Sequence, residues 1–118
     1  MTSKGTLVSI VDDDESVRES LPDLLRQCGF AAEAFLASGL VSDTSCLLVD
    51  IAMPGMSGPD LQQELIHRGQ TIPIVFITAS GDRTVRPRLL AQGAVDCLFK
   101  PFSDTALLDA VDAALQVR

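Results

Sequence analysis

Polar clusters follow four short apolar runs of this chain, one cluster after each run. The clusters combine the residue types that bind cations and phosphates: Asp12-Asp13-Asp14, Asp50, Thr78-Ala79-Ser80-Gly81 and Lys100-Pro101. Several carboxylates at close quarters repel one another unless a cation lies among them. Oxygen ligands alone favour a hard ion such as Mg²⁺, which takes one or two carboxylates and shares oxygens with a phosphate.

A hydroxyl and a lysine beside such a site supply what a phosphoryl group still needs. Thr78 offers a hydrogen-bond donor and Lys100 a positive charge. Asp50 then reads as an aspartate nucleophile that can be phosphorylated with Mg²⁺ present. Each feature alone has a simpler interpretation: an acidic run often caps a helix, a lone threonine closes a turn, and Phe99 would be plain core. The hypothesis therefore depends on one edge of a fold holding all four clusters.

Five apolar runs predict the elements that position these clusters. Helical patterns separate most of the runs, which favours repeated βα units and a doubly wound, three-layer α/β domain with a parallel sheet. The carboxyl ends of parallel strands lie at one edge, where such sheets hold their ligands. The runs are Leu7–Val11, Ala31–Leu36, Cys46–Val49, Ile72–Ile77 and Val95–Phe99.

Amphipathic spacing predicts four helices between and after these strands. The first covers Glu15–Cys28, with a bend where Pro22 removes a backbone hydrogen bond. The others run from Pro59 to Gly69, from Thr84 to Gly93 with Pro87 in the first turn, and from Ser103 onward. The inward faces are expected to be Leu61, Leu65 and Ile66 in the second of the four helices, and Leu107, Leu108, Val111 and Leu115 in the last.

The connection between the second and third predicted strands is short. Only the nine residues Ala37 to Ser45 separate them, whereas crossovers between parallel strands usually take a dozen or more. A full helix would not fit, so we expect at most one or two helical turns near Ser38–Val41.

Composition places the chain among ordinary globular domains. Its 118 residues, 47% hydrophobic and 21% charged, predict one domain over 1–118. No apolar stretch approaches about 18 residues and the N-terminus is too polar for a signal, which indicates a cytoplasmic protein without membrane contact. A net charge of −7 argues against direct nucleic-acid binding.

The cysteines and the histidine predict no metal or disulfide chemistry. Cys28, Cys46 and Cys97 lie in apolar surroundings without a CxxC or Cys/His cluster, so we expect buried free thiols. His67 has no second histidine to form a catalytic pair and is expected at the surface.

Taken together and in this order, the motifs resemble the receiver domain of bacterial two-component response regulators. The chain is similar to that family from Leu7 to nearly its C-terminus, and the sequence around its motifs is most similar to the receivers of FixJ-type transcription regulators. The residues that carry the resemblance are Val11-Asp12-Asp13, Val49-Asp50, Met53-Pro54-Gly55-Met56-Ser57-Gly58, Thr78-Ala79 and Phe99-Lys100-Pro101.

The resemblance implies a flavodoxin-like or CheY-like sheet of five parallel strands in the order 2-1-3-4-5, with helix 2 shortened or missing. It also implies that Asp50 accepts a phosphoryl group from a histidine kinase. Asp12, Asp13, Asp50 and the backbone carbonyl of Ala52 would hold Mg²⁺. Thr78 and Lys100 would bind phosphoryl oxygens, Phe99 would be the aromatic switch, and the Lys100–Pro101 bond would be cis. Signalling would use the face of helix 4, strand 5 and helix 5, commonly through a homodimer.

Three departures from the family pattern bear on these expectations. The interval from Asp13 to Asp50 is several residues short where helix 2 normally lies, Pro87 is expected to shorten or reorient the output face at helix 4, and Pro22 is expected to alter helix 1, a surface that receivers commonly present to their kinase. The expected function is a phosphorylation-dependent switch, not a turnover enzyme. Two alternatives stay open: a pseudo-receiver that signals without phosphorylation, and a Mg²⁺-dependent aspartyl phosphohydrolase, although Ala52 stands where such hydrolases place a second acid. Because Ala52 and Ser80 cannot position a water, self-dephosphorylation should take hours.

Overall fold

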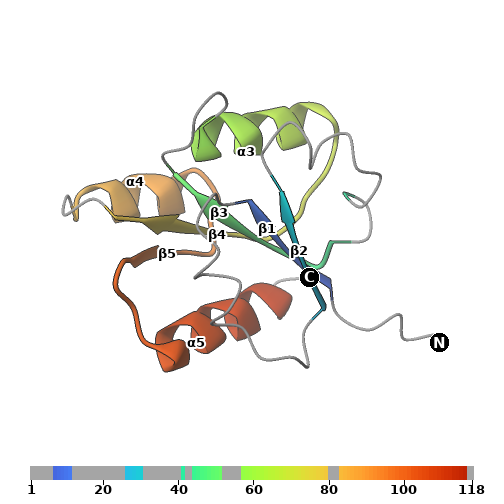
Figure 1. Cartoon of the computed structure of the whole chain (residues 1–118). Coiled ribbons are helices and arrows are strands. Elements are labelled where there is room, and N and C mark those ends of the chain that lie inside the picture. The colour runs from blue at the N-terminus through green and yellow to red at the C-terminus, as the bar shows by residue number, and fades with distance from the viewer. Residues whose placement is uncertain are drawn as a thin grey trace.

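A single parallel sheet forms the centre of the computed structural model, which describes residues 7–11, 26–30, 41, 44–51, 57–79 and 83–116. For residues 7 and 26–30 it describes the backbone alone. The strand order is β2-β1-β3-β4-β5, with every pairing parallel (Figure 1), which confirms the predicted fold class. The strands are β1 (Leu7–Val11), β2 (Arg26–Phe30), β3 (Cys46–Asp50), β4 (Ile74–Thr78) and β5 (Asp96–Phe99).

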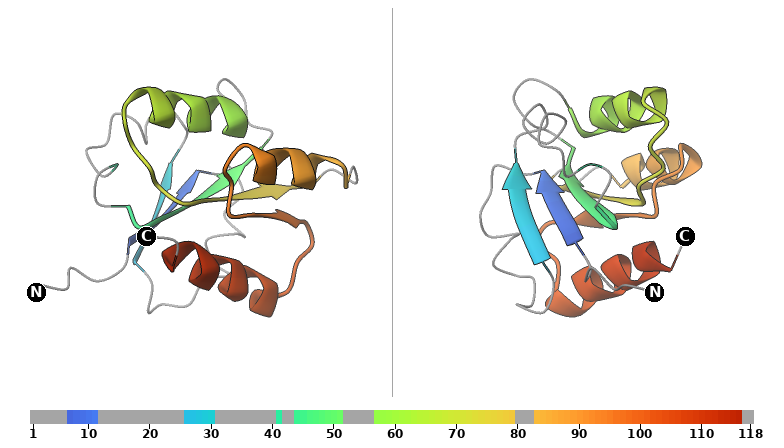
Figure 2. Two further views of the ribbon diagram at one scale, coloured as in Figure 1. Left: turned by 180° about the vertical axis from the view of Figure 1, so that it is seen from behind. Right: turned by 90° about the vertical axis from the view of Figure 1, so that its right-hand side faces the viewer.

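Helices cover both faces of this sheet. Figures 1 and 2 show α3 (Gly58–His67) and α4 (Val85–Ala91) on one face and α5 (Asp104–Leu115) on the other. Successive residues of the inner strands alternate between the faces, as the two-residue period of a strand requires. The α5-side core holds Ile10, Cys46, Leu48, Ile77 and Leu107, among others. The core on the α3/α4 side holds Leu47, Leu61, Phe76, Leu89 and Cys97, among others.

The second strand is not where the sequence predicts it. β2 covers Arg26–Phe30, so the expected helix over residues 15–28 cannot include its last three residues, and the strand expected over 31–36 is displaced. Residues 31–40, with the expected short helical turns, and the rest of that first helix, with Pro22, lie outside the described residues.

Chain length explains this shift. A strand over 31–36 would leave nine residues for the crossover to β3, whereas β2 as observed leaves the fifteen residues 31–45 and still fourteen, 12–25, for the crossover from β1. Both connections then meet the usual dozen. β2 is also an edge strand, where polar residues such as Arg26 and Gln27 are tolerated.

The three described helices begin close to their predicted starts. Ser57 caps α3 in a capping box with Asp60, and Ser103 caps α5 by accepting from the backbone N–H of Ala106. Thr84 stands at the N-cap position of α4, with Pro87 in the first turn. Gly69 and Gly93, which follow α3 and α4, have φ angles of +76° and +107°, which glycine adopts without strain.

Two of the predicted inward positions are wrong. Ile66 is 53% exposed and Leu108 is 40% exposed, while Gln62 and Ala110 are buried in their place. The buried faces of α3 and α5 therefore differ from the expected apolar stripes at these positions. His67 is exposed as predicted. No helix within the described ranges is long and apolar enough to cross a membrane.

Both cysteines whose side chains are described are buried free thiols, as predicted. Burial raises the pKa of the Cys46 thiol to about 12. The pKa of Cys97 is also raised, first by burial and then by the neighbouring Asp96 carboxylate. Neither thiol is a nucleophile at neutral pH, because the reactive form is the thiolate.

Candidate functional site

Asp50 and Lys100 meet at the carboxyl edge of the sheet. Asp50 ends β3 and Lys100 directly follows β5. The Nζ atom of Lys100 lies 3.9 Å from Oδ2 of Asp50, and the two side chains are 21% and 18% exposed. The Asp50 carboxylate is thus reachable from solvent. It faces the Lys100 ammonium, which is itself mostly buried. The sequence prediction that these two residues share one edge is consistent with this geometry.

Thr78 occupies the same edge between them. It is the last residue of β4 and is 4% exposed. Its carbonyl accepts a hydrogen bond of 2.8 Å from the backbone N–H of Lys100, and the N–H of Ile51 donates to the Ile77 carbonyl at 2.9 Å. These bonds extend the strand register by one residue beyond β3 and β5, which fixes the backbone directly around Asp50 and Lys100.

Phe99 ends β5 opposite Thr78. The two residues are Cα partners across the β4–β5 pairing, and Phe99 packs, partly buried, against the core on the α3/α4 side. The following Lys100–Pro101 peptide bond is cis, as expected. Thr78, Phe99 and Lys100 therefore share one end of two adjacent strands.

Gly58 brings the start of α3 against the phosphoacceptor candidate. A Cβ atom at Gly58 would lie 2.9 Å from the carbonyl oxygen of Asp50 and 3.0 Å from the Phe76 ring. The N–H of Gly58 also donates to the Ile51 carbonyl at 3.0 Å. Glycine is needed here for the close approach of helix to strand. In the sequence Gly58 stands out only as part of the motif over residues 53–58, although a glycine at the start of a helix, where larger residues are favoured, is a signal for tight packing.

The predicted metal ligands are described only in part. Asp12, Asp13 and Ala52 lie outside the described residues, and no group of three or more acidic, histidine or cysteine side chains gathers within those residues. β1 ends at Val11, which is paired with Val49, the residue before Asp50. The donors that follow these two strand ends are all oxygens, which is the ligand chemistry Mg²⁺ prefers.

Two arginines that the sequence reading did not single out tie α4 to β5. The guanidinium carbon of Arg83, just before α4, lies 4.3 Å from the centre of the Phe99 ring. Arg86, in the first turn of α4, donates from Nε and Nη2 to Oδ1 of Asp96 at 3.0 and 2.9 Å. No local sequence signal pairs these residues, because each contact joins different elements.

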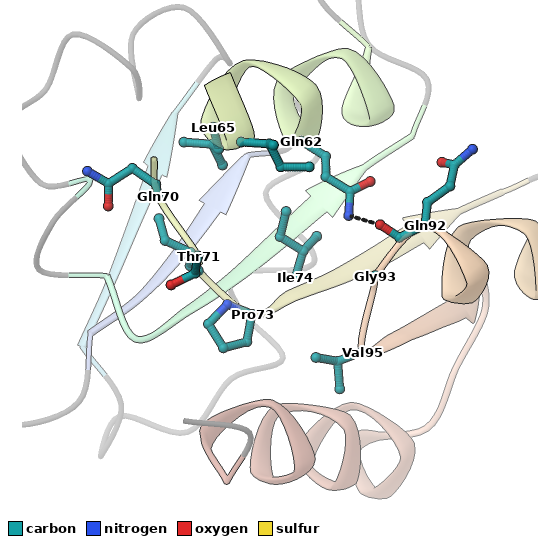
Figure 3. Close-up of a pocket in the computed structure, with 11 residues that line it drawn as sticks. Gln62, Leu65, Gln70, Thr71, Pro73, Ile74, Gln92, Gly93 and Val95 are labelled. Atoms are coloured by element: carbon teal, nitrogen blue, oxygen red, sulfur yellow. Dashed lines mark hydrogen bonds between the residues drawn. The ribbon is translucent and has the colours of Figure 1, made fainter. Parts of the chain in front are cut away.

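The opposite edge of the sheet has another character. A cavity of about 220 Å³ lies there between α3, α4 and the first residues of β4 (Figure 3). Its lining carries no charged side chain: glutamines, Thr71 and apolar residues form it. Gln62 donates to the Gln92 carbonyl at 3.4 Å, and its buried Oε1 atom has no hydrogen-bond partner among the described residues. The cavity offers no acid, base or nucleophile.

A model of the response regulator receiver domain matches residues 8–112 of the chain. "Nodulation protein W" of Bradyrhizobium diazoefficiens is 45% identical over 97% of this chain and 53% of that protein. "Transcriptional regulatory protein FixJ" of Azorhizobium caulinodans is 41% identical over 92% of this chain and 54% of that protein. The chain thus spans about half the length of these relatives.

Solved structures agree with the sequence matches. The crystal structure of FixJ-N superimposes with a TM-score of 0.81 at 35% identity, covering 98% of each chain. The response regulator StyR gives a TM-score of 0.84 at 43% identity over 96% of this chain and 60% of that one. The likeness therefore covers the whole fold described above, including the edge where Asp50, Thr78 and Lys100 lie.

Proposed function

This chain belongs to the response regulator receiver domain family, and we propose that Asp50 accepts a phosphoryl group from a phosphohistidine of a sensor kinase. In that step the P–N bond of the phosphohistidine breaks and a P–O bond to an Asp50 carboxylate oxygen forms. The domain then acts as a switch that carries one phosphoryl group, not as an enzyme that turns over a substrate.

The observation that carries this proposal is the 3.9 Å approach of the Lys100 ammonium to the Asp50 carboxylate. A fixed cation beside the acceptor oxygen stabilises the negative charge that a phosphoryl group brings. The hydroxyl of Thr78, the last residue of the strand between them, supplies the hydrogen-bond donor for a phosphoryl oxygen. Each of the three comes from the end of a different strand.

The residues present also fit a magnesium ion. Asp50 and the acids that follow β1, Asp12 and Asp13, would hold it together with the Ala52 carbonyl. Mg²⁺, when bound, neutralises charge on the phosphoryl oxygens and lets an anionic donor approach an anionic acceptor. Lys100 alone could not balance three carboxylates, so the proposal includes a dependence of phosphorylation on Mg²⁺.

We further propose that the phosphoryl signal leaves through the face of α4, β5 and α5. Thr78 and Phe99 are register partners, so a movement of the threonine toward the phosphoryl group opens space that the ring can enter. Since the relatives named above are about twice as long and include a transcriptional regulatory protein, the chain is proposed to be the receiver part of a transcription regulator. A homodimer through this face would transmit the change, while DNA contact would lie elsewhere.

The direct test is phosphorylation by a small phosphodonor with Mg²⁺, followed by intact mass. Wild type should gain one phosphoryl group, Asp50→Asn should gain none, and chelation of Mg²⁺ should abolish the gain. Asp104→Asn is a matched control, because Asp104 is an exposed aspartate in the first turn of α5. No adduct on wild type, or an equal adduct on Asp50→Asn, would contradict the proposal.

The same experiment separates the two alternatives. A pseudo-receiver would take no phosphoryl group under any condition, whereas a phosphohydrolase would release phosphate from a phosphomonoester continuously. We expect the wild-type adduct to persist for hours, because neither Ala52 nor Ser80 has a carboxylate or amide that could orient an attacking water. A lifetime of seconds would contradict that expectation.

A further inference from the structure

The Phe99 ring is covered on one face by a cation. Arg83 is exposed and lies directly before α4, and its guanidinium carbon stands 4.3 Å from the ring centre. This distance is well within the range of a favourable cation–π contact. The ring itself is partly buried and packs against the core on the α3/α4 side.

The contacts of Arg83 and Arg86 lie at opposite ends of β5. Arg86 binds Asp96, the first residue of β5, at the edge of the sheet away from the site. Asp96 is held there in turn, because its Oδ1 atom also accepts from the backbone N–H of Cys97 at 2.7 Å. Arg83 instead binds Phe99, which is next to Lys100 and opposite Thr78. Only the Arg83 contact involves a side chain at the phosphoryl site.

The Arg83 contact favours one position of the ring over another. In the structure Phe99 is partly buried and meets a guanidinium that is itself at the surface. A ring turned fully inward toward Thr78 would leave an exposed guanidinium behind. The contact thus stabilises the outward ring and contributes nothing to the inward one, so it shifts the equilibrium between them.

Resting on the proposed function, we propose that Arg83 is a positioning residue that holds Phe99 outward and opposes the phosphorylated conformation. It raises the occupancy of the outward ring in the unphosphorylated domain and so sets how readily the switch responds. An exposed contact of this kind shifts a two-state equilibrium by about two- to fivefold. Arg86 instead binds Asp96 at the other end of β5, away from the Phe99 ring.

Beryllofluoride, which mimics a phosphoryl group on a carboxylate, gives the test when titrated with Mg²⁺. Arg83→Ala should bind it about two- to fivefold more tightly than wild type, because less of the outward ring must be displaced. Arg88→Ala is the matched control, since Arg88 is an exposed arginine of α4, the helix that Arg83 precedes, and its affinity should equal that of wild type. An unchanged affinity of Arg83→Ala, combined with additive effects of the Arg83 and Phe99 substitutions, would overturn the proposal.

Removing Arg83 also removes a positive charge that attracts an anion, and a double-mutant cycle with Phe99→Leu separates the two effects. The effect of the Arg83 charge on the anion persists when Phe99 is replaced, whereas the effect of the Arg83–Phe99 contact disappears. The cycle should therefore give a coupling of about two- to fivefold between Arg83 and Phe99. Additive effects of the two substitutions would show that Arg83 acts on the anion alone.

A second readout does not depend on phosphoryl chemistry. Fluorine NMR of a 4-fluorophenylalanine placed at position 99 reports the ring environment in the unliganded domain. Arg83→Ala should move its signal toward that of the beryllofluoride-bound protein, and Arg88→Ala should not. If wild type binds no beryllofluoride, the proposed function is wrong. The Arg83–Phe99 contact is then tested by the free domain alone: a fluorine signal that Arg83→Ala leaves unchanged would overturn it.

Discussion

The helices α4 and α5 lie on opposite faces of the sheet beside β5, yet they are held in different ways. Among its twelve residues, α5 buries Leu107, Ala110, Val111 and Ala114. The seven-residue α4 buries Leu89 alone. Val85 packs, partly buried, against the same core, and Arg83, just before the helix, and Arg86 contact β5 from the surface.

This difference separates a fixed helix from a movable one. Burial of a leucine contributes about 1.5–3 kcal/mol, whereas an exposed ion pair contributes up to about 1 kcal/mol and an exposed cation–π contact about 0.5–1 kcal/mol. The attachment of α4 is therefore weak enough for a single phosphoryl group to alter. We therefore expect α5 to stay with the sheet more firmly than α4.

The largest effect is expected from loss of an α5 anchor. Leu107→Ala should lower the free energy of unfolding by about 2–5 kcal/mol, because Leu107 is fully buried and its truncation leaves a cavity. Leu108→Ala, one residue along and 40% exposed, should change it by less than about 0.5 kcal/mol. Urea denaturation followed by circular dichroism measures both. Equal losses would mean that α5 is not anchored as described.

The two buried thiols report on the two faces separately. Cys46 belongs to the α5-side core and Cys97 to the core on the α3/α4 side. If α4 opens locally, Cys97 should react with a thiol reagent at least about tenfold faster than Cys46, which needs more extensive unfolding. Peptide mass spectrometry assigns each modified cysteine. Equal rates at Cys46 and Cys97 would indicate that α4 and α5 open together.

Alkaline pH should weaken the α5 side through Cys46. Its pKa is raised from 9.0 to about 12 on folding, so the folded state holds the proton more tightly. The stability linked to this thiol is complete below pH 9 and is lost as the pH rises toward 12. Raising the pH from 8 to 10 should lower the free energy of unfolding by roughly 1 kcal/mol, as measured by urea titration. Cys46→Ala should lack this part of the alkaline loss, and an identical loss in that variant would contradict it.

The smallest effect is expected at the ion pair of α4. Arg86→Ala should cost no more than about 1 kcal/mol of global stability, because Arg86 is 47% exposed. Hydrogen exchange should nevertheless quicken in α4 and stay unchanged in α5. Arg88→Ala again serves as the comparison on the same helix. Faster exchange in α5 after Arg86→Ala would remove the distinction between the two helices.

Much of the fold follows from local pattern. β1, β3, β4 and β5 lie within one or two residues of the apolar runs, because strands buried on both faces read as continuous apolar segments. Ser103 caps the helix expected to start there, and Thr84 stands at the N-cap position of α4 without a capping side-chain hydrogen bond. Asp50, Thr78 and Lys100 could be placed at one edge because parallel strands end together.

Tertiary features explain what sequence reasoning got wrong or passed over. The alanine-rich run over 31–36 looked more strand-like than Arg26–Phe30, yet the lengths of two crossovers decide the position of β2. Ile66 is exposed and Gln62 buried because the orientation of α3 is set by Gly58 against β3, not by the apolar stripe alone. Arg83 and Arg86 find partners only once α4 lies beside β5.

The close contact at Gly58 limits which sequences this domain can explore. With the Asp50 carbonyl 2.9 Å from where a Cβ atom would stand, every other amino acid would push α3 away from the strand that carries the phosphoacceptor. Substitution of Gly58 is therefore not tolerated. Gln63, which is exposed on the same helix, can be replaced by almost any residue. A library of receivers with altered partner choice can vary the outer surface of α3 freely, provided that its first residue remains glycine.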